Sequence, residues 1–442
     1  MNSQHRPNSL RTFTIVWIGQ VASILGSKMT NFAVLIWMWQ LTGEVTPLSL
    51  LAFFNQIPIL IAAAFAGVII DYWNRKLMMI VGDVMAGLST VIIFVLFLTG
   101  NLAIWHLYLT GAVNGLFGYL QELAFSASQA LIVPKQHYVR VGAMGSMKTF
   151  GSGVLAPALA GVLYYIIGLS GILIIDFITF LIAIGTLTLV KIPQPKPSEV
   201  NQASTGKRWQ QLTLGFRYLF NRPSLIALQL FALSYIFVDT ASEVVAPMML
   251  ARSGNNTAVL GSVQGAVGLG GLIGAILLSL WGGPKRRIQG LLIGRALVFG
   301  GEMFLGLGRL PSIWMGANFG AGLFKPLANS CESAIWLSKV EPNVQGRVFA
   351  ASSFLEGIIS PLGLLIAGPL ADYVFEPAMM PGGSLAPILG NVFGTGAGSG
   401  MALQLTLFSF IVVLICLGSY AFPVLRDIED SLPDHDVEAK SA

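Results

Sequence analysis

Acidic and basic side chains lie inside long apolar stretches of the chain, where a charge is costly and therefore informative. Asp239 and Glu243 are four residues apart in the run 223–250, a spacing that places both carboxylates on one face of a helix. Two carboxylates held together in a poorly hydrated site can exchange a proton near neutral pH. Lys28 and Lys325 support a second interpretation, in which the lysines neutralise the carboxylates as structural ion pairs. Both interpretations stay open at this point.

A polar stripe in the run 103–132 forms a second candidate. Glu122 lies near the middle of this run, with Gln121 beside it and Asn114 two turns earlier. On translocon-insertion scales, a charge at the bilayer centre costs on the order of 2.5 to 3.5 kcal/mol, so we expect Glu122 to face protein or water rather than lipid. The pattern predicts that Glu122 binds substrate or a proton.

The run 311–338 carries a third group of polar residues. Lys325 and Glu332 are seven residues apart and share a helix face with Asn329, which predicts a polar track along a cavity. The remaining charges in apolar runs lie closer to the run ends or on other helices, and we assign them structural roles. These residues are Asp83, Lys148, Asp176, Arg295, Glu302 and Glu356.

Apolar runs are the elements that must position these charges. Hydrophobic residues make up 55% of the chain and charged residues 10%, which is more apolar surface than one soluble core buries. About 20 apolar residues span a hydrocarbon layer of ~30 Å as a helix. The sequence therefore predicts an all-α membrane protein with twelve transmembrane helices. We place these at about 13–41, 46–70, 77–99, 103–132, 142–168, 170–190, 223–250, 257–282, 288–308, 311–338, 347–371 and 400–424.

Basic residues predict the orientation of these spans. When successive connections alternate between the two sides, nearly all Lys and Arg outside the spans fall on one side, and Arg252 and Arg309 fall on the other. Positive charge accumulates on the cytoplasmic side, so both termini are expected there. The same rule explains the net charge of +5 without a nucleic-acid partner.

The two halves of the chain carry similar landmarks. Arg140 precedes Ala160-Gly161 by the same interval that separates Arg347 from Ala367-Gly368, which indicates a parallel repeat. A polar and basic stretch with interleaved apolar residues separates the halves and predicts a linker with an interfacial amphipathic helix. The expected organisation is a first six-helix bundle at 1–190, a cytoplasmic linker at 191–222, a second six-helix bundle at 223–424 and a disordered cytoplasmic tail at 425–442.

Several function classes lack support in the residues. Cys331 and Cys416 both lie inside predicted spans and offer neither a disulfide framework nor a thiolate metal site. The histidines have no metal-ligand spacing, and the chain contains no phosphate-binding nucleotide loop and no nucleophile elbow. We therefore expect no enzymatic activity, no catalytic residues, no metal, no cofactor and no direct use of ATP.

A short polar stretch between two apolar runs carries a family resemblance. The run from Gly67 to Leu77 resembles the loop between the second and third helices of the major facilitator superfamily, although Asn74 replaces the usual glycine. Further segments resemble the macrolide-efflux and siderophore-exporter branch of its twelve-helix drug:proton antiporters. They are Gly19-Gln20, Gln56-Ile57-Pro58, Gly346-Arg347-Val348-Phe349 and Ala367-Gly368-Pro369-Leu370-Ala371-Asp372.

The resemblance implies roles for particular residues. Asp71 would secure one conformation by interacting with the start of span 347–371 near Arg347, and Arg75 would pair with an acid in the first half. The implied set of conformational latch residues is Gly67, Asp71, Arg75, Lys76 and Arg347. A glycine–proline pattern similar to that of proton-coupled exporters implies a hinge at Gly153, Pro157 and Gly161. The spans that line the cavity in this superfamily carry Lys28, Glu122, Asp239, Glu243, Lys325 and Glu332 here.

Mixed charges and apolar walls together suggest the function. The resemblance implies a secondary transporter of the bacterial inner membrane that alternates access and works as a monomer. We expect it to export an amphipathic small molecule, such as a drug, siderophore or peptide metabolite, in exchange for protons. An importer or lysolipid flippase of the same fold, or a non-transporting membrane sensor, would present the same features, so the substrate and the direction of flux stay open.

Overall fold

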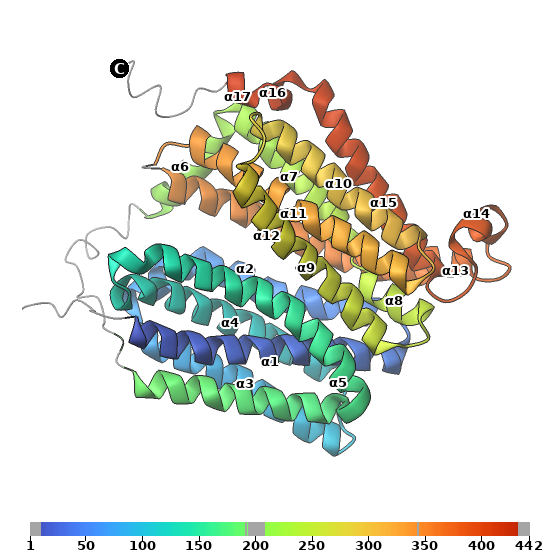
Figure 1. Ribbon diagram of the computed structural model, residues 1–442, viewed down its shortest axis with the longest axis horizontal. Coiled ribbons are helices and arrows are strands. Elements are labelled where there is room, and N and C mark those ends of the chain that lie inside the picture. The colour runs from blue at the N-terminus through green and yellow to red at the C-terminus, as the bar shows by residue number, and fades with distance from the viewer. Residues whose placement is uncertain (1–9, 191, 193–207, 343, 432–442) are drawn as a thin grey trace, which may run out of the picture. The chain divides into compact units, whose positions relative to one another are not determined.

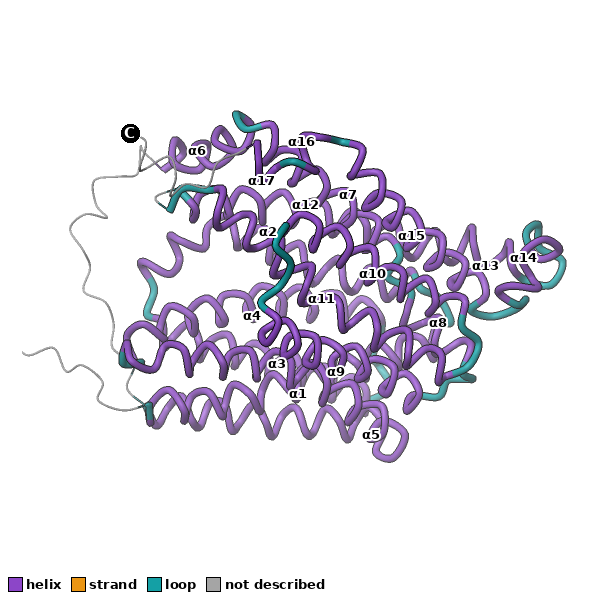
Figure 2. Tube along the Cα trace, turned by 45° about the horizontal axis from the view of Figure 1, so that its top comes forward, coloured by secondary structure: helices purple, strands orange, loops and turns teal. Residues whose placement is uncertain are grey.

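The computed structural model describes residues 10–190, 192, 208–342 and 344–431, and within these it describes 64–72, 130, 135, 139, 143, 146, 150 and 208–213 by their backbone alone. Helices and the loops between them make up this described part, which contains no strand (Figure 2). The helices follow one another along the chain as coloured in Figure 1. The prediction of an all-α protein is confirmed for these residues.

The chain forms two compact units, and the first combines three stretches of sequence. It contains the described residues of Met1–Gly43, Leu50–Ser198 and Asn256–Gly265. Within this unit α1 packs against α5, and α3 packs against α4 and α5. Its helices are α1 (Arg11–Thr42), α2 (Thr46–Tyr72) apart from the first turn, α3 (Arg75–Leu98), α4 (Ile104–Ile132), the 3-10 turn η1 (Lys135–His137), α5 (Tyr138–Leu189) and the first residues of α9 (Thr257–Trp281).

The second unit holds the first turn of α2, most of α9 and the rest of the described chain. Here α10 packs against α11 and α15, while α12 packs against α6 and α7. Its further helices are α6 (Arg208–Phe220), α7 (Pro223–Ala241), α8 (Val245–Arg252), α10 (Arg287–Leu307), α11 (Pro311–Lys339), α12 (Gln345–Leu370), the π-helical turn η4 (Ala371–Phe375), α13 (Glu376–Met379), α14 (Ala386–Phe393), α15 (Ser399–Gly418), the 3-10 turn η5 (Ser419–Ala421), α16 (Pro423–Arg426) and α17 (Ile428–Ser431).

Side-chain caps fix where several helices begin. The Asn74 side chain accepts a hydrogen bond of 3.1 Å from the Leu77 amide and starts α3. The Asp372 carboxylate accepts from the amides of Val45 and Thr46, at 2.9 and 2.7 Å, and so caps the start of α2. A carboxylate there also complements the positive end of the helix dipole.

Gly168 interrupts the long helix α5. Its φ of 64° lies in the left-handed region, which glycine adopts without the penalty that a Cβ brings. The chain therefore changes direction between the segment that ends at residue 167 and the one that begins at 169. The sequence prediction had placed the boundary between two spans at 168–170, and the structure breaks the helix at that point.

Exposed apolar side chains cover the long helices, as expected for surfaces that contact lipid. Tyr165 is 86% exposed, and Leu189 and Leu280 are each 81% exposed. A soluble protein rarely leaves so much apolar surface in water. Within the described residues, nine helical segments are long and apolar enough to cross a membrane.

The end of the described chain differs from the sequence prediction. Residues 425–442 were expected to be disordered, but α16 and α17 continue in helical turns as far as Ser431. Leu425 is 4% exposed and Ile428 is fully buried, so apolar burial holds this segment. The Glu429 carboxylate also accepts from the Ile288 amide in the first turn of α10, at 3.0 Å. Residues 432–442 lie outside the described part of the chain.

Candidate functional site

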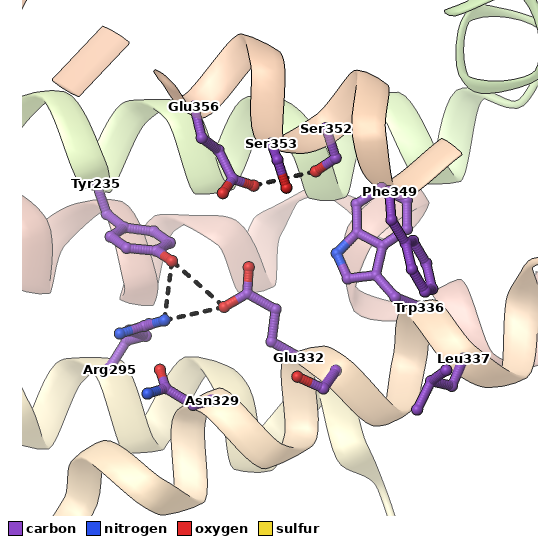
Figure 3. A pocket seen from close by; sticks show the side chains of 11 residues that line it. Tyr235, Arg295, Asn329, Glu332, Trp336, Leu337, Phe349, Ser352, Ser353 and Glu356 are labelled. Carbon is purple, nitrogen blue, oxygen red and sulfur yellow. Dashed lines mark hydrogen bonds and ion pairs between the residues drawn. The ribbon is translucent and has the colours of Figure 1, made fainter. Parts of the chain in front are cut away.

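A pocket of about 550 Å³ lies inside the second unit, between α7, α10, α11 and α12 (Figure 3). Its volume falls in the range of sites that take drug-sized ligands. Charged, hydroxyl, amide and aromatic groups line it together. The lining residues are Tyr235, Arg295, Asn329, Glu332, Ser333, Trp336, Leu337, Phe349, Ser352, Ser353 and Glu356.

An ion pair forms one side of this pocket. Arg295 Nη2 lies 2.9 Å from Glu332 Oε2 and donates to the Tyr235 hydroxyl at 2.8 Å. The Tyr235 hydroxyl donates to the same Glu332 oxygen at 3.3 Å, which closes the triangle drawn in Figure 3. The guanidinium also lies over the Tyr235 ring, 4.3 Å from its centroid. Charge-assisted bonds and a cation–π contact therefore hold Arg295 in place.

The facing side, on α12, carries a carboxylate with a different environment. Glu356 Oε1 accepts from the Ser352 hydroxyl at 3.0 Å, and that hydroxyl also lies 2.6 Å from Gln229 Oε1. Trp336 and Phe349 close this end of the pocket, with ring centroids 6.4 Å apart and planes at 83°. The pocket thus offers an acidic group on α12 and an edge-to-face aromatic pair with one ring from α11 and one from α12.

A second charged cluster in the same unit gathers three carboxylates around one ammonium group. Lys325 Nζ lies 3.9 Å from Glu302 Oε1, and it interacts electrostatically with Asp239 and Glu243 as well. The three carboxylates also interact with one another. This cluster brings together Asp239, Glu243 and Lys325, as the sequence led us to expect, and adds Glu302, which we had assigned a structural role.

The helical spacing that we expected for Asp239 and Glu243 is wrong in detail. α7 ends at Ala241, and Glu243 lies in the turn before α8 rather than on the helix face of Asp239. Ser242 causes the end, because its amide and its hydroxyl both donate to the Asp239 carbonyl, at 3.0 and 2.8 Å. Competition of serine with the backbone ladder ends a helix in this way.

The first unit holds the other predicted cavity charges. Glu122 Oε2 forms an ion pair of 2.7 Å with Lys148 Nζ, and the lysine also lies 5.1 Å from the Phe125 ring. Lys28 Nζ donates to the Ser152 hydroxyl at 2.9 Å. The Lys148 side chain is 8% exposed whereas that of Glu122 is 52% exposed, so the lysine is the desolvated partner of this pair.

Two buried acids of the first unit fit the structural role that we assigned. Asp176 accepts hydrogen bonds from three hydroxyl groups, those of Ser27, Thr30 and Thr90, at 2.8 to 3.2 Å. Asp83 accepts from Gln20 Nε2 at 3.1 Å, and Gln121 in turn donates to Gln20. Such bonds satisfy buried polar groups and link the helices that carry them.

The proposed latch residues are described in part. Gly67 and Asp71 lie in the last turns of α2, and their side-chain surroundings fall outside the described residues. Arg75 Nη1 donates to the Ala127 carbonyl at 2.7 Å, and Lys76 Nζ donates to the Val190 carbonyl at the same distance. Arg347 is exposed in the first turn of α12. These bonds attach the start of α3 to α4 and to the end of α5.

The proposed hinge makes a close helix contact inside the first unit. A Cβ on Gly161 would lie 2.5 Å from the Thr257 carbonyl oxygen in α9, and Thr257 Oγ1 donates to the Gly161 carbonyl at 2.7 Å. Gly261 approaches the Pro157 carbonyl equally closely. Gly153 has open space beside it. Gly161 is therefore a packing residue at this crossing, whatever role it has in motion.

Three residues that line the pocket were not among the site residues predicted from the sequence. Arg295 and Glu356 were assigned structural roles because of the helices that carry them, and Tyr235 was not singled out. An arginine inside an apolar run requires a partner, and this requirement was the available signal for Arg295. Tyr235 carried no such signal, because tyrosine is common in membrane helices. The described residues contain no group of three His, Cys, Asp or Glu suited to a metal ion.

Helices of membrane length, apolar outer surfaces and a charged pocket define a multi-pass membrane protein built for small-molecule transport. Residues 16–364 match the sequence profile of the Major Facilitator Superfamily, and the chain belongs to that superfamily. This confirms the family that the sequence motifs predicted, and the superfamily is one of transporters rather than enzymes.

Several relatives are bacterial exporters. Macrolide efflux protein A of Streptococcus pyogenes is 25% identical over 367 residues, which cover 82% of this chain and 90% of that protein. Enterobactin exporter EntS of Salmonella typhi is 21% identical over 342 residues, which cover 76% of this chain and 80% of that protein.

Solved structures share the fold. A bacterial homologue of the human lysosomal transporter Spinster, in an inward-facing and unoccupied conformation, superposes with a TM-score of 0.68 at 14% identity. The match covers 96% of this chain and 97% of that one. At this identity the likeness shows the fold and nothing about the substrate.

Proposed function

We propose that this transporter exports an amphipathic small molecule in exchange for protons and that it alternates access as it does so. The pocket carries this proposal, because 550 Å³ lined by aromatic, hydroxyl and charged groups suits a drug-sized compound with polar and apolar parts. The names of the two relatives, which describe macrolide efflux and enterobactin export, support export as the direction.

We further propose twelve transmembrane helices in two pseudo-symmetric halves, at 1–190 and 223–424, joined by the linker 191–222. The break at Gly168 supports two spans within α5. α4 and α11 each have 29 residues and are long enough to cross a bilayer. They are not among the nine most apolar segments because they carry more polar residues. Their polar residues, such as Glu122 and Glu332, lower the mean hydropathy, as expected of helices that line a cavity.

The charge distribution supports an inner-membrane location with both termini in the cytoplasm. Proton coupling is proposed for the second unit, where Asp239, Glu243 and Glu302 share Lys325 as their nearest cation. Carboxylates that outnumber the neighbouring cations repel one another, and this repulsion favours proton uptake by one of them. Substrate movement would then change which carboxylate holds a proton. A monomer suffices for this mechanism.

We also propose that the latch residues and the hinge residues act in the conformational cycle. Following the family resemblance, we propose that Asp71 secures the outward-facing state through the helix start near Arg347, and that Arg75 and Lys76 fix the start of α3 during the change. The contact of Gly161 with α9 supports a role for α5 in coupling helix movement to substrate release. Each role concerns the conformational cycle rather than substrate binding.

Reconstituted liposomes with an internal pH dye test the coupling. We expect macrolides or catecholate siderophores to cause proton movement in the wild type, and we expect Asp239→Asn to abolish it. Asp427→Asn is the matched control, because Asp427 lies outside the spans and pairs with Arg426 at 2.9 Å. Substrate flux without proton movement in the wild type would refute antiport, and inward flux under an outward-directed assay would indicate an importer.

A further inference from the structure

The charges of the pocket do not balance. Two carboxylates, Glu332 and Glu356, face one guanidinium, that of Arg295. Arg295 is committed to Glu332 at 2.9 Å and to the Tyr235 hydroxyl at 2.8 Å. One carboxylate, that of Glu332, therefore has a close ion-pair partner, whereas Glu356 interacts with Arg295 only at longer range.

Glu356 has a weak set of partners for a carboxylate. An ionised carboxylate accepts about four hydrogen bonds, but Ser352 has a single hydroxyl proton, which Gln229 Oε1 at 2.6 Å and Glu356 Oε1 at 3.0 Å both approach. Within the described part of the chain, no Lys or Arg lies within 4.0 Å of Glu356. Figure 3 shows its side chain directed into the pocket from α12, across from Glu332.

An aromatic surface lies along the same helix. Phe349 precedes Glu356 by seven residues, which is two helical turns or about 10 Å along the axis of α12. Trp336, on α11, packs edge-to-face against Phe349. A ligand that fills this pocket therefore meets a carboxylate outside the Arg295–Glu332 ion pair at one end and two aromatic rings at the other.

We propose that Glu356 binds the protonated amine of an amphipathic substrate whose apolar ring system packs against Trp336 and Phe349. The inference rests on the proposed export function and names the substrate class for the same pocket. A ligand ammonium supplies a cation at ion-pair distance from Glu356, and it does so without breaking the Arg295–Glu332 pair. A neutral isostere would leave the carboxylate unpaired, and an anion would be repelled by both glutamates.

The size of the preference follows from the strength of a charge-assisted bond. A hydrogen-bonded ion pair in a half-enclosed site favours the amine over a neutral isostere by about tenfold or more in affinity. Glu356→Gln has the same shape and removes the charge, so this preference should disappear while the affinity for the neutral compound stays the same. Glu356→Asp keeps the charge on a shorter side chain and should retain part of it.

A matched pair of probes tests the proposal on the full-length protein in detergent micelles. One probe is a fluorescent arylalkyl tertiary amine with about 10 Å between the nitrogen and the ring, and the other is its uncharged ether isostere. Binding is measured for the wild type, Glu356→Gln, Glu356→Asp and the control Glu44→Gln, whose exposed carboxylate lies outside the pocket. We expect the wild type and the control to prefer the amine by about tenfold.

Two results would overturn the proposal. One is equal affinity of the wild type for amine and ether, which needs no variant and so decides the matter even if Glu356→Gln does not fold. The other is an unchanged amine preference in a folded Glu356→Gln protein. Transport in proteoliposomes separates this from the proposed function. If the ether is exported as well as the amine, only the role of Glu356 fails, whereas export of neither probe, of macrolides or of siderophores removes export itself.

Discussion

Breaking the Arg295–Glu332 pair should destabilise the second unit, and the structure sets the scale of the effect. The two side chains are 12% and 13% exposed, and their closest atoms are 2.9 Å apart. Removing one partner of a fully buried pair typically costs 3 to 5 kcal/mol, because the other charge is left without compensation. Partial exposure and the remaining Tyr235 hydroxyl reduce this figure, so we expect about 2 kcal/mol for Arg295→Gln and for Glu332→Gln.

A double-mutant cycle distinguishes pairing from general damage. Because the double variant removes both members of this pair, it should be about as stable as either single variant, which gives a coupling energy of about 2 kcal/mol. Unfolding by sodium dodecyl sulfate in mixed micelles measures the free energies. The control cycle uses Arg286 and Asp430, which are 3.4 Å apart but 54% and 68% exposed. That exposed pair should couple by less than about 0.5 kcal/mol.

A stabilising role of the Arg295–Glu332 pair is refuted if the two single variants are as stable as the wild type, or if their effects on the free energy of unfolding simply add in the double variant. Either result would mean that the charges are solvated in the pocket and that the ion pair does not hold α10 against α11. The side of the pocket formed by Arg295 and Glu332 would then not be fixed in position. Arg295 would then be available to bind an anionic ligand, and the pocket would no longer favour an amine substrate.

Three further changes have expected outcomes that follow from single contacts. Gly161→Ala places a Cβ 2.5 Å from a carbonyl oxygen of α9 and should lower the free energy of unfolding by about 1 to 3 kcal/mol. In the control Gly153→Ala, the added Cβ meets no atom within 4 Å, so this variant should be neutral or slightly stabilising. Asp372→Asn removes the charge that caps α2 and should cost about 1 kcal/mol, with faster hydrogen exchange at the first amides of α2; unchanged exchange would contradict the cap. Arg252→Lys replaces a planar fork that donates to three carbonyl groups, one of them at the end of α14, so limited proteolysis at α14 should become several-fold faster; an equal rate would argue against this restraint.

The positions of the long helices follow closely from apolar run length and local signals. The run predicted at 347–371 forms α12 at Gln345–Leu370. The expected boundary between two spans near 168–170 coincides with the left-handed Gly168. Such features depend on neighbouring residues alone, so a single sequence contains the information. The side-chain cap at Asn74 is equally local, although we interpreted that residue only as a departure from a family motif.

Short-range competition at the end of a helix was harder to predict. Apolar residues continue through 223–250, and hydropathy alone gives no reason to end the helix within that run. Ser242 ends it by bonding back to Asp239, which moves Glu243 off the helix face. The same limitation applies to residues 425–431, where burial of Leu425 and Ile428 against distant helices decides order over disorder.

Pairing between helices lies beyond the reach of one sequence. Arg295 and Glu332 meet because α10 and α11 pack with a particular rotation about their axes, and Lys148 meets Glu122 for the same reason. The charges themselves were evident, and so was their need for partners. Which of them would be paired, and which would be left for a ligand, depends on rotations that many side chains decide jointly.

The two units differ in how they compensate their membrane charges, and this difference supports the roles that we propose for them. In the first unit, Glu122 has a direct lysine partner, and Asp176 is enclosed by three hydroxyl donors. In the described part of the second unit, five intramembrane carboxylates share Arg295 and Lys325: Asp239, Glu243, Glu302, Glu332 and Glu356. A surplus of acids must bind protons or cations from outside the protein to be stable in a low-dielectric setting. This surplus supports our proposals that the second unit carries the exchanged proton and selects the charge of the substrate.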